Sequence, residues 1–303
     1  MSRRFSIFAL TITGLLLLLL APSCVSIPSR TKIISQGSAG ITPIECSMTK
    51  AQLPPGTRPV SAVPALNPRH ISLLNWNIYK AQEENWAADF RTLIKEQNLV
   101  LIQEAINRPE VTSALRQQQP WWQLNTGFYY EGRETGVLTA SSTPAIFSCG
   151  IRTVEPLIRI PKTVLINLYP IANSQQALLV ANLHGINFTL GTDTYAEQLS
   201  AMTFVISQHS GPVIIAGDFN SWNAARNEVI TTAFQKLSLK KLAYENHNRV
   251  KIFGYALDHV FYRGLEVISE ETLSVTSSDH NPVRVIFALH ATELLDTDSH
   301  YIF

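Results

Sequence analysis

The chain has few cysteines, almost no excess charge and no internal repeats, and each deficit narrows its possible class. Only 3 cysteines occur in 303 residues, and none has the spacing of a structural zinc site. The 24 basic and 23 acidic residues give a formal charge of +1. That balance does not require a nucleic-acid partner, although a local basic patch would not show in the sum. General disorder is excluded, because 46% of the residues are hydrophobic and can form a substantial core.

The first 23 residues have the pattern of an export signal. Arg3 and Arg4 precede the apolar segment 5–20, and small residues follow before Cys24. The sequence Leu-Ala-Pro-Ser-Cys resembles a bacterial lipoprotein processing site, so we favour a lipid anchor at Cys24 over ordinary signal cleavage. An uncleaved anchor is the third interpretation, but the apolar segment is short for a membrane span. All three predict an exported protein, which is periplasmic, anchored to a membrane as a lipoprotein, or secreted.

Residues 24–68 have the composition of a tether or of an arm that lies on the surface of a domain. They are rich in Ser, Thr, Pro and Gly. If Cys24 carries lipid, Cys46 and Cys149 remain, and an oxidising compartment would let them form a disulfide. Two unpaired buried thiols fit the sequence equally well. The globular domain is expected at residues 69–290, followed by a polar C-terminal tail at 291–303.

Hydrophobic periodicity predicts helices interleaved with many strands, several of which follow one another with short turns. This pattern is typical of an α/β domain in which two packed sheets are flanked by helices. The expected helices are 85–97, 109–118, 193–208 and 224–237, and the expected strands are 71–79, 99–103, 121–128, 136–141, 145–152, 163–169, 177–184, 213–216, 256–263, 265–275 and 282–289.

Polar side chains suited to catalysis or metal binding stand at or near the ends of several predicted strands. Gly217-Asp218-Phe219-Asn220 follows the apolar segment 213–216, and Ser278-Asp279-His280 lies near the last strand. A strand end is rigid while the loop leaving it is open to solvent, so a functional site is favoured there. One such residue alone is more often a cap, a loop residue or a packing residue, but six positions of this kind predict one convergent site. The positions are Asn77, Glu104, His184, Asp218 with Asn220, Asp258 with His259, and Asp279 with His280.

In their order along the chain, these motifs resemble those of the endonuclease/exonuclease/phosphatase superfamily. Its members include DNase I-like nucleases, abasic-site endonucleases, sphingomyelinases and inositol-polyphosphate phosphatases. The resemblance spans about residues 71–289. It implies a DNase I-like fold, which is a four-layer α/β sandwich of two mixed sheets, and a hydrolase of phosphate esters. It also implies Mg²⁺ or a similar ion, and oxygen ligands favour Mg²⁺, Mn²⁺ or Ca²⁺ over zinc.

The same resemblance assigns roles to the residues that would hold the ion and the phosphate. Glu104 corresponds to the principal metal ligand, Asp279 to a further carboxylate near the metal, and Asn77 to a supporting amide. His280 corresponds to an imidazole that orients water as a base or contacts the phosphate. Asp258 corresponds to the carboxylate that fixes the tautomer of this imidazole and favours its charged form.

Three further positions complete the predicted site. By the resemblance, Asp218 either activates water or protonates the leaving group, and Asn220 stabilises the developing oxyanion. His184 leans away from the abasic-site endonucleases, which usually have another residue there, although it would also fit a histidine that only shapes the pocket. His259 follows Asp258 on a predicted strand, so its side chain faces the other side and is interpreted as structural.

The predicted substrate is a phosphodiester, and a nuclease-like activity is the first interpretation. A phospholipid-headgroup hydrolase or a phosphomonoesterase on the same scaffold is the alternative, and a non-catalytic lipoprotein binding module is a remote one. A nuclease needs a basic groove, but the available cations are scattered. A membrane-active enzyme needs an exposed apolar loop, for which Trp121-Trp122 is a candidate, although core packing suits it better. The scattered cations are Arg108, Arg116, Arg133, Arg226 and Lys240-Lys241.

Overall fold

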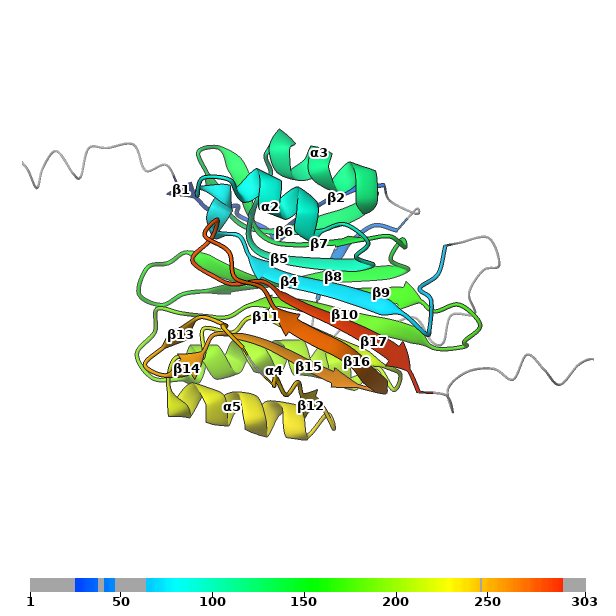
Figure 1. Ribbon diagram of the computed structural model, residues 1–303. Coiled ribbons are helices and arrows are strands. Elements are labelled where there is room, and N and C mark those ends of the chain that lie inside the picture. Colours follow the sequence, from blue (N-terminus) through cyan, green and yellow to red (C-terminus); the bar gives the residue numbers. More distant parts are fainter. Residues whose placement is uncertain (1–24, 38–40, 47–63, 246, 291–303) are drawn as a thin grey trace, which may run out of the picture.

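Two β-sheets stack face to face at the centre of the molecule, and helices cover the outer face of each (Figure 1). A computed structural model describes residues 25–37, 41–46, 64–245 and 247–290. The export signal, Cys24 and the C-terminal tail lie outside these described residues. No helix within the described ranges is long and apolar enough to cross a membrane. The layers confirm the predicted α/β sandwich.

The first sheet contains eight strands in the order β1-β6-β7-β5-β4-β17-β16, and β2 also pairs with β6. Its centre is the parallel pair of β4 (Ile71–Asn77) and β5 (Leu99–Ile106). Every residue of β4 is buried, as expected for a strand covered on both faces. The other strands are β1 (Val25–Ser26), β2 (Lys32–Gln36), β6 (Trp121–Tyr130), β7 (Arg133–Ser141), β16 (Leu265–Thr272) and β17 (Val283–Leu289).

The second sheet contains seven strands in the order β12-β15-β11-β10-β9-β8-β3. Its centre is the parallel pair of β10 (Ala177–His184) and β11 (Val213–Asp218), whose carboxyl ends lie side by side. A separate hairpin is formed by two short strands, β13 and β14. The remaining strands are β3 (Ile44–Glu45), β8 (Phe147–Val154), β9 (Pro161–Pro170), β12 (Lys240–Lys241), β13 (Lys251–Ile252), β14 (Tyr255–Ala256) and β15 (Asp258–Arg263).

Helices close the two outer faces, so the sandwich has three apolar cores. One core lies between the sheets and includes Leu101, Val180 and Phe287. A second packs the first sheet against its helices, and a third does the same for the second sheet. The helices are α2 (Trp86–Leu93) and α3 (Pro109–Gln118) on the first sheet and α4 (Asp193–Ser207) and α5 (Ala224–Gln235) on the second, with a short 3-10 turn, η1 (Tyr79–Ala81).

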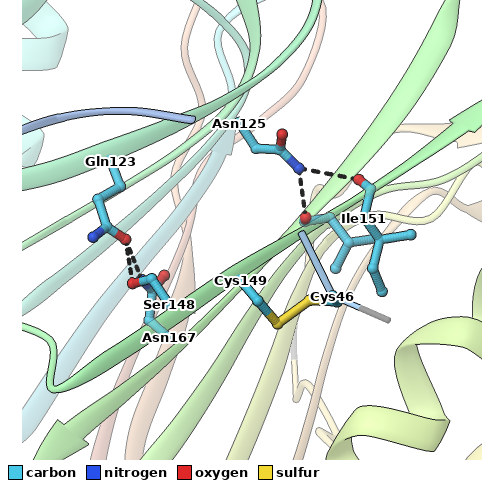
Figure 2. Close-up of a disulfide and its surroundings, with 8 residues drawn as sticks. Cys46, Gln123, Asn125, Ser148, Cys149, Ile151 and Asn167 are labelled. Carbon is cyan, nitrogen blue, oxygen red and sulfur yellow. Dashed lines mark hydrogen bonds between the residues drawn. A yellow bond between two sulfur atoms is a disulfide. The ribbon is translucent and has the colours of Figure 1, made fainter. Parts of the chain in front are cut away.

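The described part of residues 24–68 adds strands to both sheets, so it fits the arm interpretation better than the tether. Strand β2 runs antiparallel to β6, and Leu66 is buried. Cys46 and Cys149 form a disulfide, which answers the question that the sequence left open (Figure 2). A crosslink that spans 103 residues stabilises the fold by about 4–5 kcal/mol in the chain-entropy model. Figure 2 also shows Asn125 of β6, whose side chain donates to two carbonyl oxygens of the second sheet.

Several predicted elements differ from the structure at their ends. Strand β5 was expected to end at Gln103, but it continues to Ile106 through a bulge between Ile102 and Ala105. Glu104 stands in this bulge with a left-handed φ of 50°. A bulge turns one side chain out of the strand's alternation without ending the pairing, which periodicity alone does not reveal. The predicted helix 85–97 ends at Leu93, and the predicted strand 256–263 divides into β14 and β15.

Candidate active site

The ends of three strands of the second sheet bring three predicted site residues together. The β10–β11 register places His184 opposite Asp218, and the β11–β15 register places Asp218 opposite Asp258. Gly217 allows this approach, because a Cβ atom there would lie 1.9 Å from the carbonyl oxygen of Leu183. The Gly-Asp pair at the end of β11 therefore has a steric reason. The glycine leaves room for the neighbouring strand β10, and the aspartate after it lies in the site.

His280 completes a buried cluster with Asp258 and Asp218. Its Nδ1 lies 2.7 Å from Asp258 Oδ2, and its Nε2 lies 3.8 Å from Asp218 Oδ2. Burial would lower the pKa of His280, but the charges of Asp258 and Asp218 outweigh it and raise the pKa to about 10. Burial raises the pKa of Asp218 to about 6, although His280 opposes the shift. The cluster therefore holds an imidazolium and a carboxyl group that titrates near neutral pH.

Two asparagines and a histidine surround the Asp218 carboxylate. Asn77 donates from Nδ2 to Oδ2 at 3.1 Å, and the backbone N–H of Asn220 donates to Oδ1 at 2.9 Å. His184 Nε2 lies 3.4 Å from Oδ2. Because Asn77 ends β4 of the first sheet, its amide joins the two sheets at the site. Its Oδ1 accepts from the backbone N–H of Tyr79 at 3.1 Å.

The loop that carries His280 is anchored to the end of β4. Ser278 donates from Oγ to the carbonyl oxygen of Asn77 at 2.6 Å, and Trp76 donates from Nε1 to the carbonyl oxygen of His280 at 2.9 Å. Trp76 is otherwise buried in the core between the first sheet and its helices. Residues about 200 positions apart in the chain are thus held in fixed relation.

Glu104 and Asp279 form a second group of carboxylates beside this cluster. Burial would raise the pKa of Glu104, but Lys80 and Lys162 hold it below its usual value. The pKa of Asp279 is raised by burial and by the negative charge of Glu104, while His280 opposes the shift. The negative charges of the two carboxylates therefore act on each other.

Two sets of donor atoms differ in how well they suit a divalent ion. In the described part of the chain, one set of three residues has ligand atoms within 4.8 Å of one another: Asp218, Asp258 and His280. Its histidine carries a proton at neutral pH, so that proton already supplies the positive charge. Glu104 and Asp279 instead offer carboxylate oxygens, and the charge of Glu104 acts on Asp279, which suits Mg²⁺, Mn²⁺ or Ca²⁺. The chemistry of the second set fits the predicted ion better.

A pocket of about 180 Å³ opens beside Glu104. Two lysines stand in its wall, and Lys162 Nζ lies 2.8 Å from His184 Nε2. Burial and the charge of Lys162 hold the pKa of His184 well below its usual value, so the imidazole is neutral and accepts from the lysine. The other polar residues that line the pocket are Lys80, Thr135 and Thr163, and its apolar lining includes Phe128, Ile158, Ile160, Pro161 and Phe188.

Sequence reasoning missed both lysines of this pocket. Lys80 had one weak signal, since it lies three residues after Asn77 in Asn77-Ile78-Tyr79-Lys80. Lys162 had none, because it stands near the start of β9 and breaks no apolar segment. Only the packing of β9 beside β10 brings Lys162 to His184.

Arg226 was counted among the scattered cations available to a basic groove, and the structure corrects this. Its side chain is fully buried and donates to the carbonyl oxygens of Ile186, Asn187 and Asn220. It also stacks over the rings of Tyr195 and Trp222. Arg226 thus holds the loop after His184 against the loop that carries Asn220, and it cannot contribute to a nucleic-acid groove.

His259 is buried away from the cluster, as its position after Asp258 predicts. Its Nε2 lies 2.8 Å from Ser221 Oγ, and Arg249 lies 3.3 Å from its Nδ1. Burial lowers its pKa well below the usual value, so the ring is neutral. These contacts are those of a structural residue.

Comparison with known proteins identifies the family. A model described as the Endonuclease/Exonuclease/phosphatase family matches residues 74–280, and the chain belongs to this family. A UPF0294 protein from Erwinia tasmaniensis is 36% identical over 233 residues, which are 77% of this chain and 87% of that protein. The membership confirms the predicted resemblance and supports a hydrolase of phosphate esters.

Solved structures agree with the fold. An endonuclease/exonuclease/phosphatase from Beutenbergia cavernae superposes with a TM-score of 0.54 at 16% identity, covering 73% of this chain and 72% of that one. The catalytic domain of human Nocturnin gives a TM-score of 0.53 at 17% identity, covering 75% and 96%. At these identities the similarity concerns the fold alone, which is the predicted DNase I-like sandwich.

Proposed function

We propose that the protein is a divalent-metal-dependent phosphodiesterase that acts outside the cytoplasm. The observation that carries the proposal is the buried His280 imidazolium, held between Asp258 and Asp218 beside the carboxylates of Glu104 and Asp279. A phosphate ester is negatively charged and repels an incoming nucleophile. A positively charged hydrogen-bond donor beside carboxylates that can hold a metal ion is suited to compensate that charge.

Each residue of the cluster has a chemical task in this proposal. Glu104 and Asp279 would hold the ion, which neutralises the phosphate and stabilises charge on the leaving oxygen. His280 donates from Nε2 to a phosphate oxygen, while Asp258 at Nδ1 keeps the ring charged and oriented. Asp218, whose pKa is about 6, either takes a proton from the attacking water or gives one to the leaving oxygen near neutral pH.

Asn220 and His184 have supporting tasks. The Asn220 side chain donates to the carbonyl oxygen of Gly185 at 3.0 Å and lies 3.5 Å from Asp218 Oδ2, so it orients Asp218. Its proposed contact with the developing oxyanion uses the same amide group. His184 is neutral and is held by Lys162, so it is suited to accept or orient rather than to supply positive charge.

The proposed location outside the cytoplasm has support from the disulfide. A Cys46–Cys149 bridge that joins the arm to the second sheet persists in an oxidising compartment and is rare in a reducing one. It agrees with the export signal read at residues 1–23 and with the proposed lipid anchor at Cys24.

A second candidate, hydrolysis of a phospholipid headgroup, is favoured by one specific observation. Of twelve exposed large hydrophobic residues in the described ranges, seven lie on two loops and on the β13–β14 hairpin, and two of the seven, Ile158 and Phe188, line the pocket. The three segments are linked: Glu155 Oε1 accepts from the N–H of Phe188, and Trp222 donates from Nε1 to Asn187 Oδ1 while its ring contacts Phe253. Exposed apolar loop tips beside a phosphate-ester site suit an amphiphilic substrate. The seven are Leu157, Ile158, Phe188, Leu190, Ile252, Phe253 and Tyr255.

We call these seven exposed residues the apolar rim. Trp121-Trp122, the earlier candidate for membrane contact, does not belong to it. Trp122 is buried, and both residues stand at the start of β6 in the first sheet. The phosphomonoesterase alternative has no feature of its own in the site. A non-catalytic binding module is disfavoured, because the predicted polar residues converge and are charged as catalysis requires.

A panel of substrates with and without EDTA tests the proposal. Plasmid DNA, RNA, sphingomyelin vesicles and a soluble chromogenic phosphodiester are incubated with the wild type, His280→Ala and Glu104→Ala. We expect EDTA-sensitive turnover of at least one substrate and its loss in both variants, while circular dichroism shows that the fold is retained. Exposed residues of the same types, His290→Ala and Glu266→Ala, serve as matched controls.

The outcomes separate the candidates. Turnover that resists EDTA, or unchanged rates in both site variants, would contradict the metal-dependent phosphodiesterase. Turnover of DNA or RNA but not of vesicles would support the nuclease. Turnover of vesicles together with the soluble diester, without nucleic-acid cleavage, would support the headgroup hydrolase.

A further inference from the structure

The carboxylate assigned to the metal already has a cation of the chain's own beside it. Lys80 forms an ion pair with Glu104, and both side chains are only about one-fifth exposed, at 20% and 19%. Lys80 comes from the 3-10 turn that follows β4, whereas Glu104 comes from the bulge of β5. Two separate local irregularities of the backbone therefore aim these opposite charges at each other.

The backbone around Lys80 is held in an unusual conformation. Tyr79, Lys80 and Ala81 have φ angles of 48°, 55° and 56°. Non-glycine residues rarely adopt this left-handed region, and three in succession persist only when their surroundings enforce them. Asn77 Oδ1 accepts from the N–H of Tyr79, and the Ile78 carbonyl accepts from Ala81 at 2.8 Å. The site residue Asn77 thus also fixes the turn that presents Lys80.

We propose that Lys80 is a resident cation of this site: it pairs with Glu104 until a divalent ion binds there, and then binds a phosphate oxygen of the substrate. The proposal rests on the metal-dependent function proposed above, and it adds a coupling between the metal and the anion. It involves binding only and no covalent step.

The charges around the pocket make metal binding at Glu104 and anion binding at Lys80 favourable together. When an ion takes the oxygens of Glu104, the ammonium of Lys80 loses its partner and can turn toward the adjoining pocket, where an anion can take the place of Glu104. Lys162 and a neutral His184 also line the adjoining pocket, and among the described residues of its lining Glu104 is the one carboxylate. A phosphate group entering there would compensate both lysines. Metal and anion therefore favour each other's binding, and this coupling is reciprocal.

Calorimetric titration of Mg²⁺ into the full chain tests the first step, in which the ion displaces Lys80 from Glu104, without substrate. Lys80→Gln removes the competing cation, so we expect it to bind Mg²⁺ about 5- to 150-fold more tightly than the wild type, the usual range for such coupling. Lys80→Arg keeps the charge and should restore the wild-type affinity. Lys236→Gln, an exposed lysine at the end of α5, is the control, and Glu104→Gln should abolish the binding. Unchanged or weaker Mg²⁺ binding in Lys80→Gln would overturn the proposal.

The second step is tested by repeating the titration with inorganic phosphate present. We expect phosphate to tighten Mg²⁺ binding in the wild type, and this tightening to shrink at least about fivefold in Lys80→Gln. Lys162→Gln should change the phosphate-free Mg²⁺ affinity less than Lys80→Gln does, yet weaken phosphate binding. Equal tightening in the wild type and Lys80→Gln would show that Lys80 does not bind the anion.

These outcomes are distinguishable from failure of the proposed function. A chain that hydrolyses a phosphodiester with dependence on His280 and metal, but shows no effect of Lys80 on Mg²⁺ affinity, keeps the function and loses this inference. A chain without metal-dependent turnover loses the function, whatever the titrations show.

Discussion

Two neighbouring parts of the site handle charge in different ways. The histidine cluster, Asp218, Asp258 and His280, is almost completely buried, and its imidazolium lies between the two carboxylates. The lysine cluster, Lys80, Glu104 and Lys162, lies beside it but lines an open pocket. Lys80 and Glu104 each keep about one-fifth of their side-chain surface exposed.

This difference in burial separates side chains that must stay fixed during a reaction from side chains that must exchange their binding partners. Buried groups that hold each other in place cost no reorganisation when charge develops during a reaction. Partly exposed groups can let go of one partner for another, because water and mobile side chains compensate the change. The histidine cluster is thus suited to proton transfer and the lysine cluster to binding ions. Unfolding free energy should respond strongly to substitutions in the first cluster and weakly to those in the second.

The largest effect is expected for Asp258→Asn. Removing one partner of a buried ion pair should cost about 3–5 kcal/mol of unfolding free energy at pH 6. It should also lower the turnover rate about 10²- to 10⁴-fold, since His280 loses the group that orients and charges it. Asp193→Asn, an exposed aspartate in the first turn of α4, is the control and should cost less than about 1 kcal/mol.

The pH dependence of this loss has a definite sign. The pKa of His280 is about 10 in the folded protein, above its ordinary value of 6.5, so its stabilising contribution is complete below pH 6.5. That contribution disappears as the pH rises from 6.5 to 10. Urea unfolding across this window should therefore show the difference between the wild type and Asp258→Asn shrinking with rising pH. A difference that grows toward pH 10 would contradict a charged His280.

Arg226→Met should have the next largest effect, because Arg226 supports the histidine cluster from behind. Three carbonyl oxygens lose their donor, which at about 1 kcal/mol each should cost about 3 kcal/mol. Turnover should also fall, since Asn220 is no longer held. Arg284→Met breaks a half-exposed pair with Glu271 and should cost less than about 1 kcal/mol. Equal losses in denaturant unfolding would contradict the distinction between buried and exposed arginines.

Glu104→Gln tests the lysine cluster and should change stability by no more than about 1 kcal/mol. Lys80 loses its partner but can turn its ammonium toward the open pocket. Metal-dependent turnover should nevertheless be lost. Thermal unfolding beside an activity assay measures both effects, and a destabilisation as large as that of Asp258→Asn would remove the contrast between the two clusters.

The smallest stability effect is expected at the apolar rim. Leu190 is 85% exposed, so Leu190→Ser should change the unfolding free energy by less than about 0.5 kcal/mol. If the substrate is a lipid, hydrolysis of vesicles should fall while hydrolysis of a soluble diester stays unchanged. Ile268→Ser, exposed on β16 away from these loops, is the matched control. Equal vesicle hydrolysis in the wild type, Leu190→Ser and Ile268→Ser would count against membrane contact by the rim.

Part of the site could be read from the sequence because its residues interrupt local patterns. Asp218 breaks an apolar strand after Gly217, and His280 stands in a polar motif before the last strand, so periodicity marks both. The position of Glu104 was only partly predictable, since a bulge and not the end of β5 aims it. Arg226 and Lys162 gave no usable signal, because the burial of Arg226 and the partner of Lys162 depend on loops and strands that are distant in the chain.

The sequence by itself determined the class of fold and the kinds of groups in the site. Those follow from the spacing of apolar residues and from motifs of a few adjacent positions. Only the tertiary structure decided that Cys46 pairs with Cys149, that Arg226 is buried, and that Lys80 meets Glu104. Such contacts arise from strand order and packing. These bring together segments whose local sequences do not indicate which other segments they will contact.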